Sequence, residues 1–281
     1  MKSWYCEKQS PGTKYCYEAR RIFKKTSKSQ TIEVFDSKEN GKLLVIDGLL
    51  MLSERFEFPY HEMLVHIPLF SHRKPRNLLI IGGGDGGSVR EGLKHRMVNQ
   101  ISLCEFDKDV IEISKHFFPF AKRSFENRRV RVYFQDGLDF LRKSDKHVYD
   151  VIINDSTDPT GPAAALFTGE FYDLAKKCLK QDGIFCTIGS TPFCEKGIVN
   201  KIDKALKSTF NHVHHYLAYV PMYQSGCWSF ALASSEAISL KKRQRGGPSK
   251  EITCKYYNAK IHTACFQLPE FLHNQLYGKY T

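Results

Sequence analysis

The stretch Asn77-Leu78-Leu79-Ile80-Ile81-Gly82-Gly83-Gly84-Asp85-Gly86-Gly87 joins an apolar run to a glycine-rich loop, and a helix-like segment begins at residue 88. Glycine clusters also form ordinary strand-to-helix turns, so the loop alone does not identify a ligand site. An acidic residue about 20 residues past the first glycine, here Glu105, has the spacing at which a nucleotide-binding α/β fold holds a ribose diol. Since ligands of open α/β sheets bind at the carboxyl ends of the strands, the stretch predicts a nucleoside site.

Asp85 distinguishes this loop from the dinucleotide-binding pattern. A carboxylate at the start of a helix would repel a phosphate group at the very place where the helix amide groups and dipole favour anions. A nucleoside that carries a positive charge fits better. The loop therefore favours S-adenosylmethionine or a relative, whose sulfonium and ammonium groups are cationic.

Strand-like and helix-like segments alternate from residue 77 onward, which predicts a mostly parallel sheet with right-handed crossovers. The expected strands are 77–81, 101–105, 130–134, 148–154 and 183–188, with a closing antiparallel pair at 214–220 and 228–233. The expected helices begin at 88 and 138 and span 109–118, 169–179 and 197–210. The predicted fold class is α/β, with a Rossmann-like, methyltransferase-type sheet of seven strands.

The first 52 residues follow a different pattern. The alternating residues 31–35 and the apolar run 42–46 flank an Asn40-Gly41 turn, which is typical of a β-hairpin. A helix is expected over 60–70. We therefore predict a small antiparallel β domain over residues 1–52 and a catalytic domain over residues 53–281.

Further acidic residues follow the later strands. Asp136-Gly137 could be a common turn, but with Asp85 and Glu105 it would complete a nucleoside pocket by meeting the exocyclic amine of an adenine. Asp155 and Asp158 lie in the loop 155–162, which contains two prolines. Such a pair could bind a metal, cap a helix or act as a base. An amine ligand is favoured, because an alkylamine with a pKa near 10.4 arrives protonated and needs a base before it can attack.

The composition argues against several other classes of protein. The formal charge is +12, but Lys and Arg are spread along the chain apart from the run 241–245, which is typical of a solvated loop, so no nucleic-acid partner is expected. The 9 cysteines are scattered and form no Cys-x-x-Cys pair, which predicts neither a disulfide framework nor a metal site. No segment resembles a signal peptide or a membrane span, so we expect a soluble cytoplasmic protein with no membrane partner.

Short motifs distributed over nearly the whole chain resemble the polyamine aminopropyltransferase family, to which the spermidine synthases belong. The motifs are Trp4-Tyr5 with Glu7-Lys8-Gln9, Leu44-Val45-Ile46-Asp47-Gly48, Phe58-Pro59-Tyr60-His61-Glu62-Met63, residues 80–87, Cys104-Glu105, Gln135-Asp136-Gly137, residues 155–162, Leu166-Phe167, Pro221 with Tyr223, Ser225 and Gly226, and the tail segments 255–258 and 268–271.

The resemblance implies transfer of an aminopropyl group from decarboxylated S-adenosylmethionine to putrescine, with no metal or other cofactor. It implies that Asp155 is the proton acceptor. The residues implied for the amine acceptor are Asp158, Ser156, Thr157, Tyr60, His61, Tyr223 and Asp85. Those implied for the nucleoside donor are Gln30, Gly82, Asp85, Gly86, Glu105, Asp136, Gly137 and Pro162.

Several residues on the acceptor side depart from the family pattern, namely Phe56, Ile188, Ser190 and Phe193. Each removes a possible contact to the far ammonium of a diamine, so another or broader acceptor stays open: cadaverine, diaminopropane, agmatine or spermidine. A small-molecule methyltransferase and a non-catalytic polyamine-binding protein are less favoured interpretations. Asp85 argues against the former, and the intact Asp155 and Asp158 argue against the latter. Since isolated hairpins are marginal in water, the N-terminal β domain predicts a homodimer or homotetramer.

Overall fold

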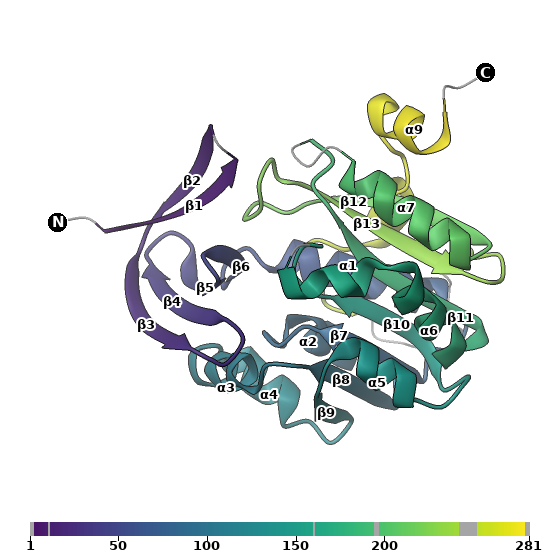
Figure 1. Ribbon diagram of the computed structural model, residues 1–281, viewed down its shortest axis with the longest axis horizontal. Coiled ribbons are helices and arrows are strands. Elements are labelled where there is room, and N and C mark those ends of the chain that lie inside the picture. The colour runs from purple at the N-terminus through teal and green to yellow at the C-terminus, as the bar shows by residue number, and fades with distance from the viewer. Residues whose placement is uncertain (1–2, 11, 160, 194–196, 242–251, 279–281) are drawn as a thin grey trace.

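The computed structural model describes residues 3–10, 12–159, 161–193, 197–241 and 252–278 (Figure 1). In the view of Figure 1 an N-terminal β region lies at the left, and a central sheet flanked by helices fills the rest. Residues 242–245 of the basic run lie outside the described ranges. Across those ranges, no helix is both long enough and apolar enough to cross a membrane.

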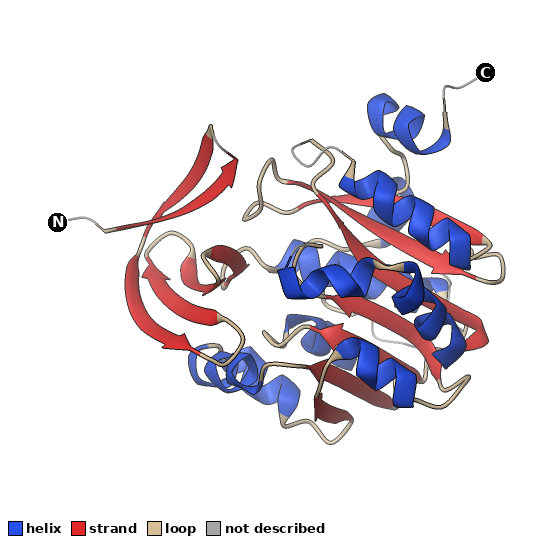
Figure 2. Cartoon of the chain, in the orientation of Figure 1, coloured by secondary structure: helices blue, strands red, loops and turns tan. Residues whose placement is uncertain are grey.

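The central sheet has seven strands in the order β12-β13-β11-β10-β7-β8-β9, which confirms the predicted fold class (Figure 2). The strands are β7 (Asn77–Gly82), β8 (Gln100–Glu105), β9 (Val130–Phe134), β10 (Tyr149–Asp155), β11 (Leu179–Ser190), β12 (His212–Tyr219) and β13 (Cys227–Ser234). Strands β7 to β11 are parallel, and β13 is antiparallel to both β11 and β12. The chain proceeds from β7 outward to β9 and then crosses back to β10 on the other side of β7. Ligands of such sheets bind at this switch point.

Helices cover both faces of the central sheet. One buried apolar cluster contains residues of α1 (Phe58–Ser71), α2 (Gly87–Lys94), α3 (Lys108–Phe117) and α4 (Pro119–Phe125). A second contains residues of α5 (Gly137–Lys143), α6 (Gly169–Cys178) and α7 (Ile198–Thr209). Because successive side chains of a strand point to opposite faces, β7 contributes to both. Its Leu78 and Ile80 belong to the first cluster, and its Leu79 and Ile81 to the second.

Two antiparallel sheets precede the central sheet. β1 (Trp4–Ser10) pairs with β2 (Thr13–Glu18), and a four-stranded sheet contains β3 (Arg20–Thr26), β4 (Thr31–Ser37), β5 (Gly41–Ile46) and β6 (Leu49–Ser53). The predicted hairpin is confirmed, since β4 pairs with β5 and Ser37 lies opposite Gly41. Gly41 has a φ of +68°, a left-handed conformation that glycine adopts at little cost.

A disulfide joins Cys6 of β1 to Cys16 of β2, so the prediction of no disulfide framework is wrong at this hairpin. The two residues lie directly opposite each other in the antiparallel register. Their approach depends on the pairing of two strands that no Cys-spacing motif reveals. Free thiols are found at Cys104, Cys178, Cys186, Cys227 and Cys265.

Several short helices were not predicted from the sequence. The helix expected over 109–118 ends at Phe117, and Pro119 begins α4, because its fixed φ and missing N–H suit the first turn of a helix. A 3-10 helix, η1 (Gly161–Phe167), follows the loop after β10. Two helices, α8 (Ala259–Ala264) and α9 (Glu270–Tyr277), lie in the C-terminal tail.

The tail is tied to α1 by a single buried carboxylate. The side chain of Glu62 accepts hydrogen bonds at 2.8 Å from three successive backbone N–H groups, those of Lys255, Tyr256 and Tyr257. Glu62 is almost completely buried. Hydrogen bonds to the charged form compensate the loss of water around this carboxylate, so the tail and α1 stabilise each other.

Candidate active site

The register of the central sheet places the glycine-rich loop next to Asp155. Asp155 ends β10 and lies opposite Gly82, and the Gly83 N–H donates to the Asp155 carbonyl oxygen at 2.9 Å. Gly82 has a φ of +80°, and a Cβ atom there would lie 2.3 Å from that carbonyl oxygen. Only glycine fits this position, and its absent side chain lets the two strand ends face one ligand.

Asp85 lies in the turn that leads into α2. Its Oδ1 accepts a hydrogen bond from the Gly87 N–H at 2.6 Å and lies 3.3 Å from Nε2 of His61. Burial alone would lower the pKa of His61, but Asp85 and Glu57 outweigh it and raise this pKa well above its usual range. The two carboxylates therefore favour the imidazolium form of His61, whose charge would partly neutralise Asp85. A Cβ on Gly87 would lie 2.4 Å from its ring, so this contact also requires glycine.

Glu57 and Arg90 hold the side of the His61 ring that faces away from Asp85. Nδ1 of His61 lies 2.6 Å from Oε2 of Glu57, and Arg90 donates two hydrogen bonds to the same carboxylate at 2.7 and 2.8 Å. Burial would raise the pKa of Glu57, but His61 and Arg90 lower it to about 2. Sequence reasoning missed Glu57 and Arg90. The available signal was the spacing of Glu57 and His61, four residues apart, which puts them on one side of a helix turn.

Asp155 is buried and hydrogen-bonded at the end of β10. The Tyr60 hydroxyl donates a hydrogen bond to Oδ1 of Asp155 at 2.6 Å. Burial raises the pKa of Asp155 above its usual range and the charge of Asp85 adds to this, while His61 and Tyr60 act in the opposite direction. A carboxylate with raised proton affinity is better matched to proton transfer near neutral pH than an ordinary aspartate.

A cavity of about 350 Å³ runs along the carboxyl ends of the central strands. Burial raises the pKa of Glu105, which lines it, to about 7. Gly84 leaves space for this side chain, since a Cβ on Gly84 would lie 2.8 Å from Oε2 of Glu105. The predicted residues that line this cavity are Gln30, Tyr60, Gly82, Asp85, Glu105, Asp136, Gly137, Asp155, Ser156, Thr157 and Tyr223.

The N-terminal sheet forms part of the wall of this larger cavity. Gln30 precedes β4, and the side chains of β5 and β6 contribute Leu44, Ile46, Leu49 and Met51. Two contacts hold the sheet to the helix that follows Glu105. Ser27 donates to Oδ2 of Asp107 at 2.6 Å, and Lys25 lies 2.8 Å from Oδ1 of Asp109.

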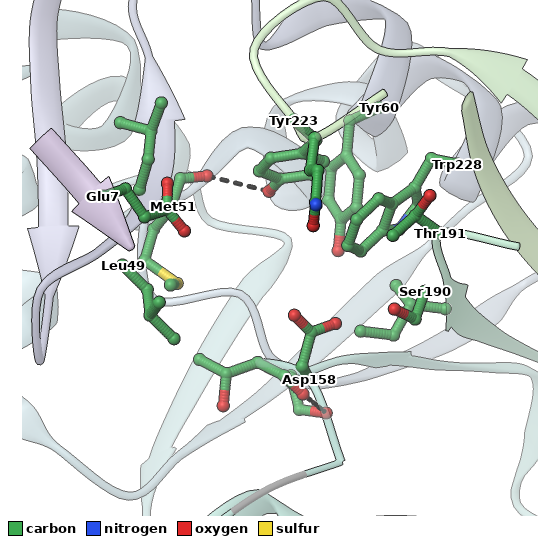
Figure 3. A pocket seen from close by; sticks show the side chains of 14 residues that line it. Glu7, Leu49, Met51, Tyr60, Asp158, Ser190, Thr191, Tyr223 and Trp228 are labelled. Atoms are coloured by element: carbon green, nitrogen blue, oxygen red, sulfur yellow. Dashed lines mark hydrogen bonds between the residues drawn. The ribbon is translucent and has the colours of Figure 1, made fainter. Parts of the chain in front are cut away.

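A second cavity, of about 60 Å³, adjoins the first (Figure 3). Its acidic lining residues are Asp158, from the loop after β10, and Glu7, from β1. The rings of Tyr60 and Tyr223 meet edge to face with centroids 5.5 Å apart, and Trp228 packs on Tyr223 at 4.5 Å. The residues that line both cavities mark their junction: Leu49, Met51, Tyr60, Ser156, Thr157 and Tyr223.

Glu7 is a lining residue that sequence reasoning did not assign to the site. Along β1 the buried residues Tyr5 and Glu7 alternate with the exposed residues Trp4, Cys6 and Lys8. The sequence Trp4-Tyr5-Cys6-Glu7-Lys8 has no matching alternation of apolar and polar residues, so the strand period alone could not have identified this inward-facing acid.

Two of the predicted site residues, Gly86 and His61, line neither cavity. Gly86 packs against Ala121 and Phe125 of α4. His61 lies behind Asp85 with no exposed surface, so it does not face an amine channel directly. A third predicted residue, Pro162, has a side chain that lies outside the described part of the chain.

The acceptor-side departures divide into two pairs. Ile188 and Ser190 line the smaller cavity. Phe56 and Phe193 are not among the residues that line it, and Phe193 instead packs on Phe271 with ring centroids 4.9 Å apart. Among the described residues, no group of three or more His, Cys, Asp or Glu side chains is arranged to hold a metal ion.

Family models match both parts of the chain. Residues 57–242 match the "Spermine/spermidine synthase domain", and residues 3–54 match the "Spermidine synthase tetramerisation domain".

Curated relatives extend over almost the whole chain. Polyamine aminopropyltransferases of Caldicellulosiruptor saccharolyticus and Clostridioides difficile are 38% and 36% identical, covering 97% and 98% of this chain and 97% and 99% of their own lengths. Among solved structures, spermidine synthase in complex with the transition state analogue AdoDATO is 37% identical with a TM-score of 0.93. The structure of spermidine synthase from Thermotoga maritima is 37% identical with a TM-score of 0.92. Each match covers 98% of this chain and 94% of the solved chain.

Proposed function

The chain belongs to the spermine/spermidine synthase family and is a polyamine aminopropyltransferase, and from this we propose that it makes spermidine. It would transfer the aminopropyl group of decarboxylated S-adenosylmethionine to putrescine and release 5'-methylthioadenosine. The observation that carries the proposal is the position of Asp155, buried beside the junction of the two cavities. A solved relative, a spermidine synthase bound to a transition state analogue, supports the same acceptor.

The larger cavity, from here on the donor cavity, would hold the sulfonium nucleoside. Glu105 would accept hydrogen bonds from the ribose hydroxyls, and Asp136 would meet the adenine amine. Asp85 would face the ammonium of the aminopropyl group. An ordinary methyl donor carries a carboxylate beside that ammonium, which Asp85 would repel, so this aspartate favours the decarboxylated donor.

The smaller cavity, from here on the acceptor cavity, would hold the amine. Asp155 would take a proton from the attacking ammonium, whose nitrogen would then attack the methylene carbon next to sulfur. The new C–N bond forms as the C–S bond breaks, and the electron pair of that bond stays on sulfur. The leaving group is a neutral thioether, so we propose that the reaction needs no metal or other cofactor.

Assembly and location are part of the proposal. The family model for residues 3–54 describes a tetramerisation domain, and Trp4, Tyr15 and Ile22 of the N-terminal strands are exposed. We propose a homodimer or homotetramer formed through these residues, in the cytoplasm. Light scattering coupled to size-exclusion chromatography measures the assembly, and a monomer at micromolar concentration would contradict it.

The decisive experiment is an acceptor panel. The purified protein is incubated with decarboxylated S-adenosylmethionine and putrescine, cadaverine, diaminopropane, agmatine or spermidine, and products are identified by mass spectrometry. We expect spermidine and 5'-methylthioadenosine in equal amounts with putrescine. If one of the other amines reacts much faster, the family activity stands and the putrescine assignment is wrong. Absence of transfer to every amine would refute the proposed function.

A further inference from the structure

Among the described residues that line the acceptor cavity, two are acidic and none is basic. These fourteen residues include Glu7 and Asp158 but no Lys, Arg or His. In a chain of formal charge +12, such a cavity attracts cations through its local rather than its overall charge. Figure 3 shows Asp158 below the Tyr60 and Tyr223 rings, and Glu7 beside Leu49 and Met51 on another wall.

The two acids lie on different sides of the path that an amine would follow. Asp155 lines the donor cavity, whereas Asp158 and Glu7 line the acceptor cavity, and Tyr223 lines both. The charges of Asp155, Asp158 and Glu7 all contribute to raising the pKa of Tyr223, after burial and Asp85, so this one hydroxyl lies within electrostatic reach of each carboxylate. Because Tyr223 lines both cavities, an amine with one nitrogen at Asp155 would pass Tyr223 to enter the cavity that Glu7 lines.

The two residues of the acceptor cavity that depart from the family pattern supply no charge to it. Ile188 is apolar and Ser190 is neutral. Glu7 is thus the acidic group, besides Asp158, that this cavity offers to a far ammonium.

The backbone around Glu7 is anchored to the opposite wall of the acceptor cavity. Glu7 pairs with Tyr15 across the β1–β2 hairpin, and the Tyr15 hydroxyl accepts a hydrogen bond from the Ser225 N–H at 3.3 Å. Tyr17 donates to the Met222 carbonyl oxygen at 3.0 Å. The hairpin and the loop that carries Tyr223 therefore form one unit, and the Glu7 side chain, 8% exposed, is held within it.

We propose that Glu7 binds the far ammonium of the amine acceptor and thereby sets the length of diamine that this enzyme prefers. The inference rests on the proposed function, because it assumes that the acceptor occupies the smaller cavity. It assigns a specificity-determining residue to the N-terminal hairpin, outside the sheet that carries the reaction.

The test compares a diamine with a monoamine of equal length. Glu7→Gln keeps the shape of the side chain and removes its charge. For 1,4-diaminobutane we expect kcat/KM to fall about 10–150-fold, the range for a hydrogen bond to a charged group. For 1-aminobutane, tested as a substrate or a competitive inhibitor, we expect less than a threefold change, since it has no far ammonium. Glu18→Gln is the matched control on the same hairpin, because Glu18 is exposed and lines neither cavity. This variant should leave the kinetic constants for both amines unchanged.

A second variant tests the role in length. Glu7→Asp withdraws the carboxylate by one methylene, so the preference should shift from 1,4-diaminobutane towards 1,5-diaminopentane by about tenfold in the ratio of kcat/KM values. This ratio is measured on one enzyme preparation, so partial unfolding of the variant does not affect it.

The outcomes separate this inference from the proposed function. If Glu7→Gln lowers kcat/KM equally for the diamine and the monoamine, Glu7 only supports the hairpin. If kcat/KM for the diamine is unchanged, Glu7 does not contact the substrate. Either result overturns the inference, as does a Glu7→Asp enzyme with the wild-type length preference. A wild-type enzyme that transfers no aminopropyl group to any amine would instead overturn the proposed function.

Discussion

The donor and acceptor cavities meet at Tyr60 and Tyr223, but their walls come from different parts of the molecule. The donor-side acids, Asp85, Glu105 and Asp136, each lie at or directly beyond the end of a strand of the central sheet, whose parallel register fixes their relative positions. The acceptor-side acids come from the loop after β10 and from the β1–β2 hairpin. Under the proposed function, recognition of the nucleoside would therefore depend on the sheet itself, whereas recognition of the amine would depend on elements that pack onto it.

This difference has a consequence for substitution. A side chain at Gly82 would meet the Asp155 backbone at 2.3 Å, so the donor cavity tolerates little change. Ile188 and Ser190 line the acceptor cavity beyond the reacting atoms, and neither supplies a charge. Acceptor choice can therefore change while the donor cavity and the base stay intact.

The largest expected effect comes from removing the proposed base, Asp155, which lines the donor cavity beside its junction with the acceptor cavity. Asp155→Asn should reduce turnover by roughly 10²–10⁴-fold, because the attacking ammonium loses its proton acceptor. Affinity for methylthioadenosine should remain nearly unchanged. Steady-state kinetics between pH 7 and 9 and calorimetric titration measure the two quantities. Turnover close to wild type over this range would contradict the assignment, and Asp158→Asn, as a comparison, should raise the KM for the amine more than it lowers kcat.

Asp85→Asn should separate two donor-cavity ligands that differ in charge. The amide oxygen can still accept the Gly87 N–H, so the loop is preserved. Binding of the decarboxylated donor should weaken by about 1.5–3 kcal/mol more than binding of methylthioadenosine, because the donor alone carries an ammonium. Isothermal titration calorimetry with both ligands gives the difference. Losses of equal size for the two would show that Asp85 has a different role.

The enzyme should discriminate only weakly between diamines of different length, and a negative charge added on β11 should increase this discrimination. In the wild type, cadaverine should compete with putrescine to within about two orders of magnitude, because the two amines differ by one methylene, which is worth only about 1–3 kcal/mol in an enzyme pocket. Ser190→Asp should increase the preference for putrescine by adding a fixed anion. Ser190 has a φ of +68°, which aspartate and asparagine tolerate better than most residues, so Ser190→Asn is the uncharged control. Complete rejection of cadaverine by the wild type, with no effect of Ser190→Asp, would contradict this prediction.

The smallest effect concerns the protonation of Glu105 in the empty donor cavity. Burial raises its pKa to about 7, and under the proposed function its ionised form would accept hydrogen bonds from the ribose hydroxyls. Affinity for methylthioadenosine should therefore be lost as the pH falls through 7, by about tenfold between pH 8 and pH 6 if only the ionised form binds. Fluorescence or calorimetric titrations at several pH values measure this slope. Glu105→Gln should bind more weakly and show no such dependence; a pH-independent wild type would contradict the role.

The donor side could be predicted well from the sequence because its information is local. The apolar run before Gly82 and the acids after later strands gave β7, β8 and β10, and the register then brought Asp85, Glu105 and Asp155 together. His61 contacts Asp85 and lines neither cavity, a position that helix periodicity does not reveal.

The acceptor side depends on packing between distant segments, which local patterns do not reveal. The hairpin that carries Glu7 contacts the loop at Tyr223 more than 200 residues later in the chain, as the Tyr17 contact with Met222 shows. The Cys6–Cys16 disulfide escaped prediction for the same reason, because it requires the strand register. Phe193 was expected near the amine but packs on α9, a helix that was not predicted.

The three hydrogen bonds from the tail to Glu62 also imply an order of events during synthesis of the chain. Lys255 lies 193 residues beyond Glu62, and at about 5–20 residues per second a ribosome needs about 10–40 seconds to add them. Until then the carboxylate of Glu62 lacks its donors, and α1 cannot bury it without a large cost in free energy. Because α1 also carries Tyr60 and His61, we expect a growing chain to complete this site only after residues 255–257 have left the ribosome.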